Sequence, residues 1–373
     1  MTAAVHNEKP RTSTRDHSVI ARRLSPWLRK TLGADGAPVV HARGGPSKNG
    51  MSSDTVLIDV DATIEGVDRS FALVVRLPPP ADAFPVFPDY DLARQADVMQ
   101  MVASSSTVPV PTIVGFEPDP GLLGAPFLVM TRIDGIVAPD MLPYPFGSWL
   151  SEADSDAQRR VESAAVDVLV GIHGIGSPTS PLNRFELAFE GNTALERHVA
   201  QQRQYFEWAR RDRAFSIIER VFQRLNATWP DDTGDVLSWG DARLGNIMWS
   251  DFRPVAVLDW ESVAVAPREV DLGWMVFFHA YFQEAARGRG IEGMPTFMRR
   301  SAVEGAYTSR SGHAPRDFDW YLLYAALRQA LVSIRVRDRA VAFGETPPPA
   351  DVEDLIMQLP MLQALADGTY DWT

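Results

Sequence analysis

The stretch "SWGDARLGNIMWSDFRPVAVLDWE", residues 238–261, sets three polar residues among apolar neighbours. Two short apolar runs are joined by Ser, Asp and Pro, which favour turns, so the stretch predicts a β-hairpin. Asn246 enters this hairpin and Asp259 leaves it, and we expect the two side chains to lie together at its open end. Asp241 stands five residues before Asn246, on a tight loop that leads to the same place.

Three oxygen-bearing side chains at one point suit a hard cation such as Mg²⁺, which takes one or two carboxylates besides waters and phosphates. The spacing Asp-x-x-x-x-Asn is also that of a loop that catalyses phosphoryl transfer, in which Asp orients the attacking hydroxyl. Each residue has a structural alternative: Asp241 as a turn residue, Asn246 as a cap and Asp259 as an arginine partner. The occurrence of all three in order favours a functional site.

Composition sets the broad class of the protein. The chain has 373 residues, 45% apolar content, 23% charged content and a net charge of −12, which predicts a soluble globular protein of two or three packed units. Its acidity disfavours nucleic-acid partners, and the lack of a long apolar run disfavours a membrane location. Cysteine is absent and the first residues resemble no secretory signal, so we expect a cytoplasmic protein without disulfides.

The pattern of elements changes along the chain. A helix with apolar spacing is expected within residues 13–33, with a stop at Gly33, followed by five strands and one internal helix at 91–106. The segment "EGVDR" (65–69) is expected to be a hairpin turn, and the region after residue 133 is mostly helical. The expected class is α+β, with a disordered tail at 1–15, a β-rich N-lobe at 16–133 and a helical C-lobe at 134–373.

Three motifs carry a family resemblance: "WGDARLGN" (239–246), "LDWE" (258–261) and "APREVDL" (266–272). They resemble the signature of the aminoglycoside and macrolide phosphotransferases, and the likeness extends over roughly residues 20–340. The strand "VVRLPP" (74–79) is similar to the phosphotransferase-like domains fused to some acyl-CoA dehydrogenases. The resemblance implies a two-lobed protein-kinase-like fold, with a nucleotide-binding N-lobe and a C-lobe that holds the catalytic loop and a helical substrate-binding subdomain.

The resemblance also implies roles for individual residues. Asp241 and Asn246 would form the catalytic loop, with Asp241 as the base, and Asn246 and Asp259 would bind Mg²⁺. Asp271 would brace that loop, although a helix N-cap is an equally good interpretation. ATP or GTP would be the co-substrate. Its contacts are implied for the phosphate-covering loop 44–53, which contains Gly45 and Ser47, and for a hinge formed by Met130, Thr131, Arg132 and Ile133.

Three departures from the family pattern bear on activity. Trp239 replaces the usual His, Arg76 stands where the phosphate-gripping lysine would fall, and Gln95 stands near the position of its glutamate partner. Arg76 either grips phosphates or is a solvated strand end. Arg76 and Gln95 motivate a catalytically weak, pseudokinase-like nucleotide-binding module as an alternative. A second alternative is a scaffold that binds no nucleotide, in which the three polar residues of the opening stretch are structural. His173, at the end of a helix, is expected to be a packed core residue.

The segment 184–224 bears on the identity of the acceptor. It holds eight arginines and six acidic residues, which gives it a net charge of 8 − 6 = +2. A positive wall argues against polycationic aminoglycosides and fits a neutral or anionic acceptor, such as a hydroxyacyl thioester of coenzyme A. The alternative is that these arginines form solvated helix faces. The sequence thus predicts a Mg²⁺-dependent phosphotransferase that moves the γ-phosphate of ATP or GTP to a hydroxyl of a small molecule; the oligomeric state stays open.

Overall fold

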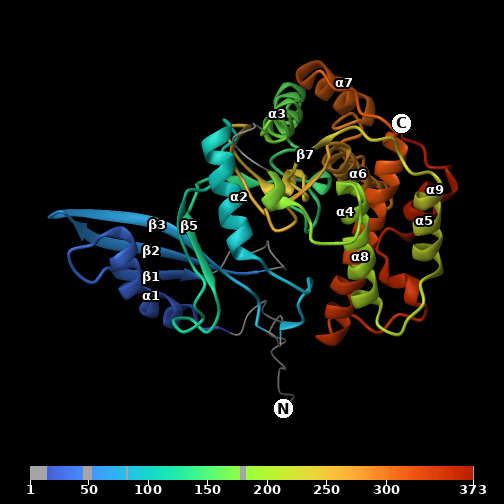
Figure 1. The fold of residues 1–373 in the computed structure, drawn as a ribbon. Helices are drawn as coiled ribbons and strands as arrows, with labels where there is room; N and C mark the ends of the chain where they lie inside the picture. Colours follow the sequence, from blue (N-terminus) through green and yellow to red (C-terminus); the bar gives the residue numbers. More distant parts are fainter. Residues whose placement is uncertain (1–14, 45–52, 81–82, 177–181, 373) are drawn as a thin grey trace, which may run out of the picture. The chain divides into compact units, whose positions relative to one another are not determined.

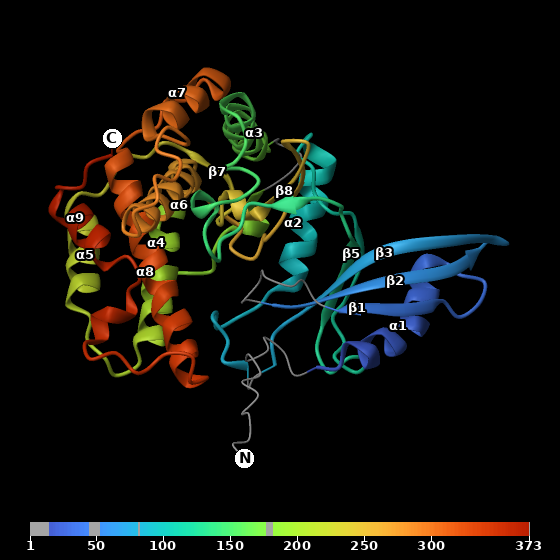
Figure 2. The same ribbon diagram turned by 180° about the vertical axis from the view of Figure 1, so that it is seen from behind.

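The computed structural model describes residues 15–44, 53–80, 83–176 and 182–372, which form two compact units. The sheet-rich unit comprises Met1–Leu92, Val114–Thr131 and Val336–Pro348, and the helical unit comprises Ala93–Ile113, Arg132–Arg335 and Pro349–Thr373. Figures 1 and 2 show the chain from two opposite sides. The expected α+β class is confirmed, since the larger sheet belongs to the first unit and most helices to the second.

The sheet-rich unit is built on five strands in the order β1-β2-β3-β5-β4 (Figure 1), and the neighbours β1–β2, β2–β3 and β3–β5 pair antiparallel. Its elements are α1 (His17–Leu32), β1 (Val39–Gly44), β2 (Asp54–Ile64), β3 (Val67–Leu77), β4 (Ile113–Glu117) and β5 (Phe127–Thr131). The expected hairpin turn is shorter than 65–69: β3 begins at Val67, because Glu65 and Gly66 alone reverse the chain with φ of 51° and 73°.

One face of this sheet packs on α1. Alternate residues of β2, namely Val56, Ile58 and Val60, are fully buried with Leu24 and Leu28 of the helix. The helix starts where the Asp16 carboxylate accepts the amide of Ser18 at 2.8 Å, and it ends at Gly33 in the left-handed conformation. Cap residues and apolar periodicity therefore agree on the bounds of α1, as the sequence predicted.

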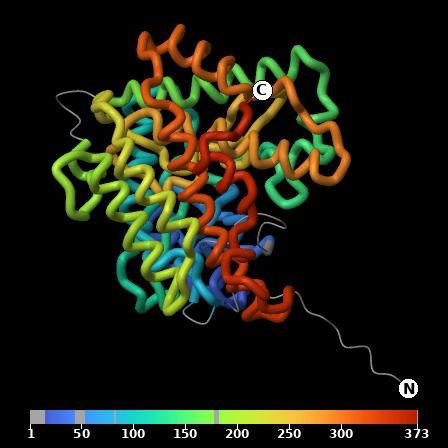
Figure 3. Tube along the Cα trace, turned by 90° about the vertical axis from the view of Figure 1, so that its right-hand side faces the viewer, coloured from blue at the N-terminus to red at the C-terminus, as the bar shows by residue number. Residues whose placement is uncertain are grey.

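The helical unit places two small β-sheets among long helices. Strands β6, β8 and β9 form one sheet and β7 pairs with β10, while α3 packs against α7 (Figure 1) and α9 against α5 (Figure 3). No helix within the described ranges is long and apolar enough to cross a membrane. The elements are α2 (Leu92–Ser105), β6 (Ile136–Val137), η2 (Tyr144–Phe146), α3 (Ser155–His173), η3 (Leu182–Phe185), α4 (Ala194–Arg210), α5 (Ser216–Ala227), β7 (Asp235–Ser238), η4 (Leu244–Asn246), β8 (Ile247–Ser250), β9 (Arg253–Val257), β10 (Ala264–Pro267), α6 (Glu269–Arg287), α7 (Arg300–Ser311), α8 (Phe318–Ala342), η5 (Val352–Leu355) and α9 (Leu359–Asp367).

Two buried histidines make the stability of the helical unit depend on pH. Burial lowers the pKa of His198 to about 3, with a smaller effect from Arg328, and burial lowers the pKa of His279 to about 4. Below pH 6.5 the unfolded chain therefore binds protons that the folded chain does not, and the free energy of unfolding falls as the pH falls. The expected slope is roughly 1.4 kcal/mol per pH unit for each histidine.

Urea unfolding at pH 7, 6 and 5 measures this slope. His198→Gln should flatten it by about half if both histidines contribute equally, since the glutamine amide can still contact the Tyr324 hydroxyl that lies 2.6 Å from His198 Nδ1. An unchanged slope in His198→Gln would show that this histidine is protonated in the folded protein as readily as in the unfolded chain.

Candidate active site

The predicted hairpin is present and has the expected ends. Strands β8 and β9 pair antiparallel with Ile247 opposite Val257, and the amide of Leu258 donates to the Asn246 carbonyl at 2.8 Å. Asn246 therefore begins the hairpin and Asp259 follows directly after its last cross-strand hydrogen bond. The hairpin interpretation of residues 246–259 is confirmed, and it brings these two residues to one open end.

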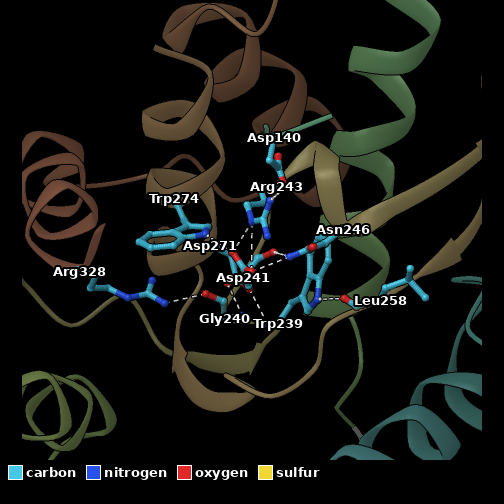
Figure 4. A network of polar contacts seen from close by, with 10 residues as sticks. All are labelled: Asp140, Trp239, Gly240, Asp241, Arg243, Asn246, Leu258, Asp271, Trp274 and Arg328. Atoms are coloured by element: carbon cyan, nitrogen blue, oxygen red, sulfur yellow. Dashed lines mark hydrogen bonds and ion pairs between the residues drawn. The ribbon is translucent and has the colours of Figure 1, made fainter. Parts of the chain in front are cut away.

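Asp241 is the centre of a polar network (Figure 4). Its carboxylate accepts from Asn246 Nδ2 at 2.6 Å, from Trp274 Nε1 at 2.7 Å and from Arg243 Nε at 3.0 and 3.1 Å. The Asp241 side chain is still 19% exposed. The carboxylate is thus fixed by three donors from two segments of the chain while part of it faces solvent, so it is both oriented and accessible to a ligand.

Arg243 joins Asp241 to a second carboxylate. Its Nη1 forms an ion pair with Asp140, which precedes η2. Burial raises the pKa of Asp140 above its ordinary value, against the effect of Arg243, and Asp241 and Asp259 add to the rise. Burial alone would lower the pKa of Arg243, but Asp241 and Asp140 raise it, so the guanidinium stays charged. A side chain at Gly245 would overlap the Asp140 carboxylate, which explains a glycine there.

Asp271 fixes the backbone that leads to Asp241. It is fully buried in the first turn of α6 and accepts the amides of Trp239 at 2.7 Å and Gly240 at 2.8 Å. The Ser238 hydroxyl donates to it at 2.9 Å, and His173 Nε2 lies 3.0 Å away. Burial alone would raise the pKa of Asp271, but these contacts, led by His173, hold it below its ordinary value. The N-cap of α6 is Arg268, so the geometry favours a brace over a cap.

Trp239 links the same loop to the hairpin. Its indole is fully buried, and its Nε1 donates to the Leu258 carbonyl at 2.9 Å, one residue before Asp259. Trp239 therefore still makes a polar contact through its ring, although it stands where the family pattern has a histidine. Asp259 itself has a φ of 60°, a conformation that non-glycine residues adopt rarely and that is concentrated at functional sites.

The donor set at the hairpin end fits a hard divalent cation. Asn246 is 6% exposed, and because its Nδ2 faces Asp241, its amide oxygen is directed away from that carboxylate. This oxygen and the Asp259 carboxylate are the ligand types that Mg²⁺ prefers. Within the described ranges no three His, Asp or Glu side chains converge on one metal position. Mg²⁺ tolerates such an incomplete protein shell, since waters and phosphates fill the remainder.

Residues 46–299 match the phosphotransferase enzyme family, which is more than half of the chain. The chain belongs to the phosphotransferase enzyme family. It is 26% identical over 191 residues to acyl-CoA dehydrogenase family member 10 of Mus musculus and 28% identical over 210 residues to family member 11 of Homo sapiens. These alignments cover 51% and 55% of this chain but only 17% and 25% of the two relatives. The family resemblance stated from the motifs is therefore confirmed.

A solved structure supports the fold of this phosphotransferase over almost its full length. A Ralstonia eutropha JMP134 protein described as an aminoglycoside phosphotransferase superposes with a TM-score of 0.64 and 19% identity. The superposition covers 93% of this chain and 97% of the other. At this identity the likeness concerns the fold alone, and it confirms the kinase-like α+β class.

Four residues of the site in this phosphotransferase were not predicted: Asp140, Arg243, Trp274 and Arg328. Arg243 could have been found, since it lies inside the quoted motif and an arginine between two catalytic-loop residues is itself a signal. The other three come from segments about 30 to 100 residues away, and no spacing in the sequence connects them to Asp241.

The sheet-rich unit of the phosphotransferase contains some of the candidate nucleotide contacts, among them Arg76, Met130 and Thr131. Arg76 is 9% exposed and donates to Ser53 Oγ from Nε at 3.0 Å and from Nη2 at 2.6 Å, so it is not a solvated strand end. Met130 pairs with Val74 on the next strand and Thr131 ends β5. Arg132 and Ile133 follow in the helical unit, and Gly45 and Ser47 lie outside the described residues.

Gln95 lies on α2, in the helical unit, and is 1% exposed. Neither of its side-chain polar atoms has a hydrogen-bond partner among the described residues. A buried amide without partners costs folding free energy, so packing alone does not account for glutamine at this position.

Several arginines of segment 184–224 form ion pairs within the phosphotransferase itself, and one of these pairs, Arg220–Asp367, reaches outside the segment. Arg203 pairs with Glu219 at 2.7 Å, Arg220 with Asp367 at 2.8 Å and Arg197 with Glu186 at 3.3 Å. A cavity of about 640 Å³ lies between α4 and α5, but its lining contains no residue of the catalytic loop or of the hairpin. Part of this charge is thus held in ion pairs on helix faces, and the preference for a neutral or anionic acceptor stays a prediction.

Proposed function

We propose that this phosphotransferase is a Mg²⁺-dependent kinase that moves the γ-phosphate of ATP or GTP to a hydroxyl group of a small molecule. The observation that supports it most is the Asp241 carboxylate, which is fixed by Asn246 and Trp274 beside the open end of the hairpin and stays partly exposed. Phosphoryl transfer requires positioning and charge stabilisation more than covalent chemistry by the protein, and this arrangement supplies the positioning.

In the proposed step the acceptor oxygen attacks the γ-phosphorus, and the bond from that phosphorus to the β-phosphate oxygen breaks. The proton of the acceptor hydroxyl passes to Asp241. In the structure, Arg243 Nε donates to both carboxylate oxygens of Asp241. The acceptor hydroxyl would replace one of these two contacts, while the ion pair with Asp140 keeps the guanidinium in place. The Arg243 charge then stabilises Asp241 before the transfer and lies beside it during the transfer.

The hairpin end is the proposed cation site. The amide oxygen of Asn246 and the carboxylate of Asp259 would hold Mg²⁺, which when bound neutralises phosphate charge. Trp239, through the Leu258 carbonyl, fixes the backbone immediately before Asp259. Asp259 would thereby keep its unusual conformation when no cation is present.

The nucleotide would bind to the sheet-rich unit. Arg76 is proposed to grip its phosphates, with the 44–53 loop, including Gly45 and Ser47, covering them. Support comes from the two hydrogen bonds that tie Arg76 to Ser53, the last residue of that loop. The adenine or guanine ring would meet the backbone of Met130, Thr131, Arg132 and Ile133.

Arg76→Ala should weaken ATP binding by about 10- to 150-fold, because a charge-assisted hydrogen bond of this kind contributes roughly 1.5–3 kcal/mol. Arg76→Lys should recover part of the loss, since lysine offers one point charge in place of a planar fork. Calorimetric titration with ATP and Mg²⁺ measures the change. Adenosine is the control, because it has no phosphates and should bind all three proteins alike; equal ATP affinity in Arg76→Ala would exclude Arg76 from the phosphate site.

The alternative is a catalytically weak, pseudokinase-like nucleotide-binding module, which is favoured by the arginine at position 76 and the unpartnered amide of Gln95. Transfer of γ-³²P from ATP to a panel of hydroxyl compounds separates the two functions. The panel should contain neutral, anionic and cationic acceptors, with hydroxyacyl thioesters of coenzyme A and aminoglycosides among them. A rise in melting temperature with Mg·ATP, without transfer to any acceptor, would support the alternative.

A further inference from the structure

Arg328, on α8, reaches the catalytic loop from the interior of the helical unit (Figure 4). Its Nη2 donates to the carbonyl oxygen of Gly240 at 2.6 Å, and this carbonyl belongs to the peptide bond that joins Gly240 to Asp241. On the other side of the same residue, the Gly240 amide donates to Asp271 at 2.8 Å. Both backbone polar groups of the residue before Asp241 are therefore held by buried charged side chains.

The same guanidinium also acts on the side chain of Asp241, through Trp274. It lies over the Trp274 ring, 4.1 Å from the ring centroid, and the indole Nε1 donates to Asp241 Oδ1 at 2.7 Å. A planar guanidinium stacks favourably on an indole face. Arg328 thus restrains Asp241 by two independent routes, one through the backbone and one through the ring that holds its carboxylate.

Packing alone does not explain an arginine at this position. Arg328 is 5% exposed, and its Nη1 has no hydrogen-bond partner among the described residues. Burial lowers the pKa of its guanidinium, against the opposing effects of Tyr324, Asp271 and Asp241. A buried charge with incomplete hydrogen bonding costs folding free energy, and an apolar residue of similar length would fill the same space without that cost.

We propose that Arg328 is a positioning residue for phosphoryl transfer, which orients Asp241 through the Gly240 carbonyl and the Trp274 ring. The proposal rests on the proposed function, in which Asp241 receives the proton of the acceptor. The effect of Arg328 on the reaction passes through these two neighbours. Its loss should therefore lower the turnover rate while the binding of the nucleotide stays nearly the same.

Helix α8 offers a matched control two turns further along. Arg335 is also 5% exposed, and its guanidinium lies 4.1 Å from the centroid of the Trp208 ring. Trp208 belongs to α4, and its ring packs on the Tyr205 ring of the same helix with the centroids 5.5 Å apart. Arg335→Met therefore removes a stacked, buried guanidinium from the same helix, while Arg328 keeps its own contacts with Gly240 and Trp274.

The kinetic test compares Arg328→Met, Arg328→Lys and Arg335→Met at saturating acceptor. We expect kcat of Arg328→Met to fall by about 10- to 100-fold, the range typical for residues that support a catalytic group, with KM for the nucleotide within about threefold. Arg328→Lys should recover part of kcat, because an ammonium can still donate to Gly240 but cannot stack in the same way. A kcat in Arg328→Met equal to that in Arg335→Met would overturn the proposal.

Hydrogen–deuterium exchange gives a second readout that needs no activity. Peptides covering residues 239–246 should exchange faster in Arg328→Met than in the wild type and remain unchanged in Arg335→Met. Unchanged exchange in Arg328→Met would show that Arg328 does not order the loop and would overturn the proposal. If the wild type transfers phosphate to no acceptor, the proposed function fails, and the exchange result still decides whether Arg328 holds Asp241.

Discussion

Asp241→Asn should lower phosphoryl transfer by about 10²- to 10⁴-fold, the usual contribution of a general base. The asparagine keeps the size of the side chain and one oxygen for the Trp274 and Arg243 donors, but it cannot accept the acceptor proton. Arg243 keeps its ion pair with Asp140, so the loop should stay folded. Steady-state kcat with the best acceptor measures the loss, and ATP affinity should change little.

Asp259→Ala is the informative contrast to this substitution. It removes a proposed Mg²⁺ ligand and leaves the base intact, so it should weaken the binding of Mg·ATP much more than Asp241→Asn does. Titrations of the two variants with Mg·ATP and with metal-free ATP separate the roles. Asp241→Asn with turnover within a factor of a few of the wild type would remove Asp241 from the mechanism, and unchanged Mg·ATP affinity in Asp259→Ala would make Asp259 structural.

Asp271→Ala should cause the largest loss of stability among these substitutions, about 3–5 kcal/mol in the free energy of unfolding. The change leaves the amides of Trp239 and Gly240 without their acceptor inside the protein, and it removes the carboxylate that lies against His173 Nε2. Because the pKa of Asp271 is lowered in the folded state, its contribution is present at neutral pH and is lost as the pH falls below the ordinary range of an aspartate. Urea unfolding at pH 7 measures the loss.

Asp156→Ala is the control that shows how much stability an aspartate contributes merely by lying in the first turn of a helix. Asp156 also lies in the first turn of a helix, α3, but its side chain is 72% exposed and pairs only with Arg159 on the surface. Asp156→Ala should therefore cost no more than about 0.5 kcal/mol. A loss below about 1 kcal/mol in Asp271→Ala would mean that water or a backbone shift satisfies the freed amides of the catalytic loop.

Local patterns in the sequence were sufficient to predict the hairpin and the polar residues at its ends. Turn residues and alternating apolar residues lie within one short stretch, so the positions of Asn246 and Asp259 follow from local rules. The brace at Asp271 could not be separated from a helix cap in the same way. Both interpretations require an acidic residue at the start of a helix, and only the contacts to Trp239 and Gly240 distinguish them.

Contacts between distant segments account for what the sequence did not reveal. Asp140 and Arg328 meet the catalytic loop from positions about 100 and 90 residues away, and their sequence surroundings resemble ordinary loop and helix. The charge that segment 184–224 presents also depends on a distant contact. A sum of charges does not show that Arg220 pairs with Asp367, which lies far outside that segment.

The guanidinium buried beside Ser53 also bears on how proteins of this kind can be detected. Chemical probes that capture nucleotide-binding enzymes often carry a reactive acyl group that is transferred to a lysine amine near the bound phosphates. Position 76 offers no amine, and the lysines of this chain are confined to positions 9, 30 and 48. Of these three lysines, only Lys48 belongs to the loop proposed to cover the phosphates. An inventory of phosphotransferases based on lysine acylation would therefore detect this chain only through Lys48, and it would miss relatives that place arginine at this strand and have no lysine in that loop.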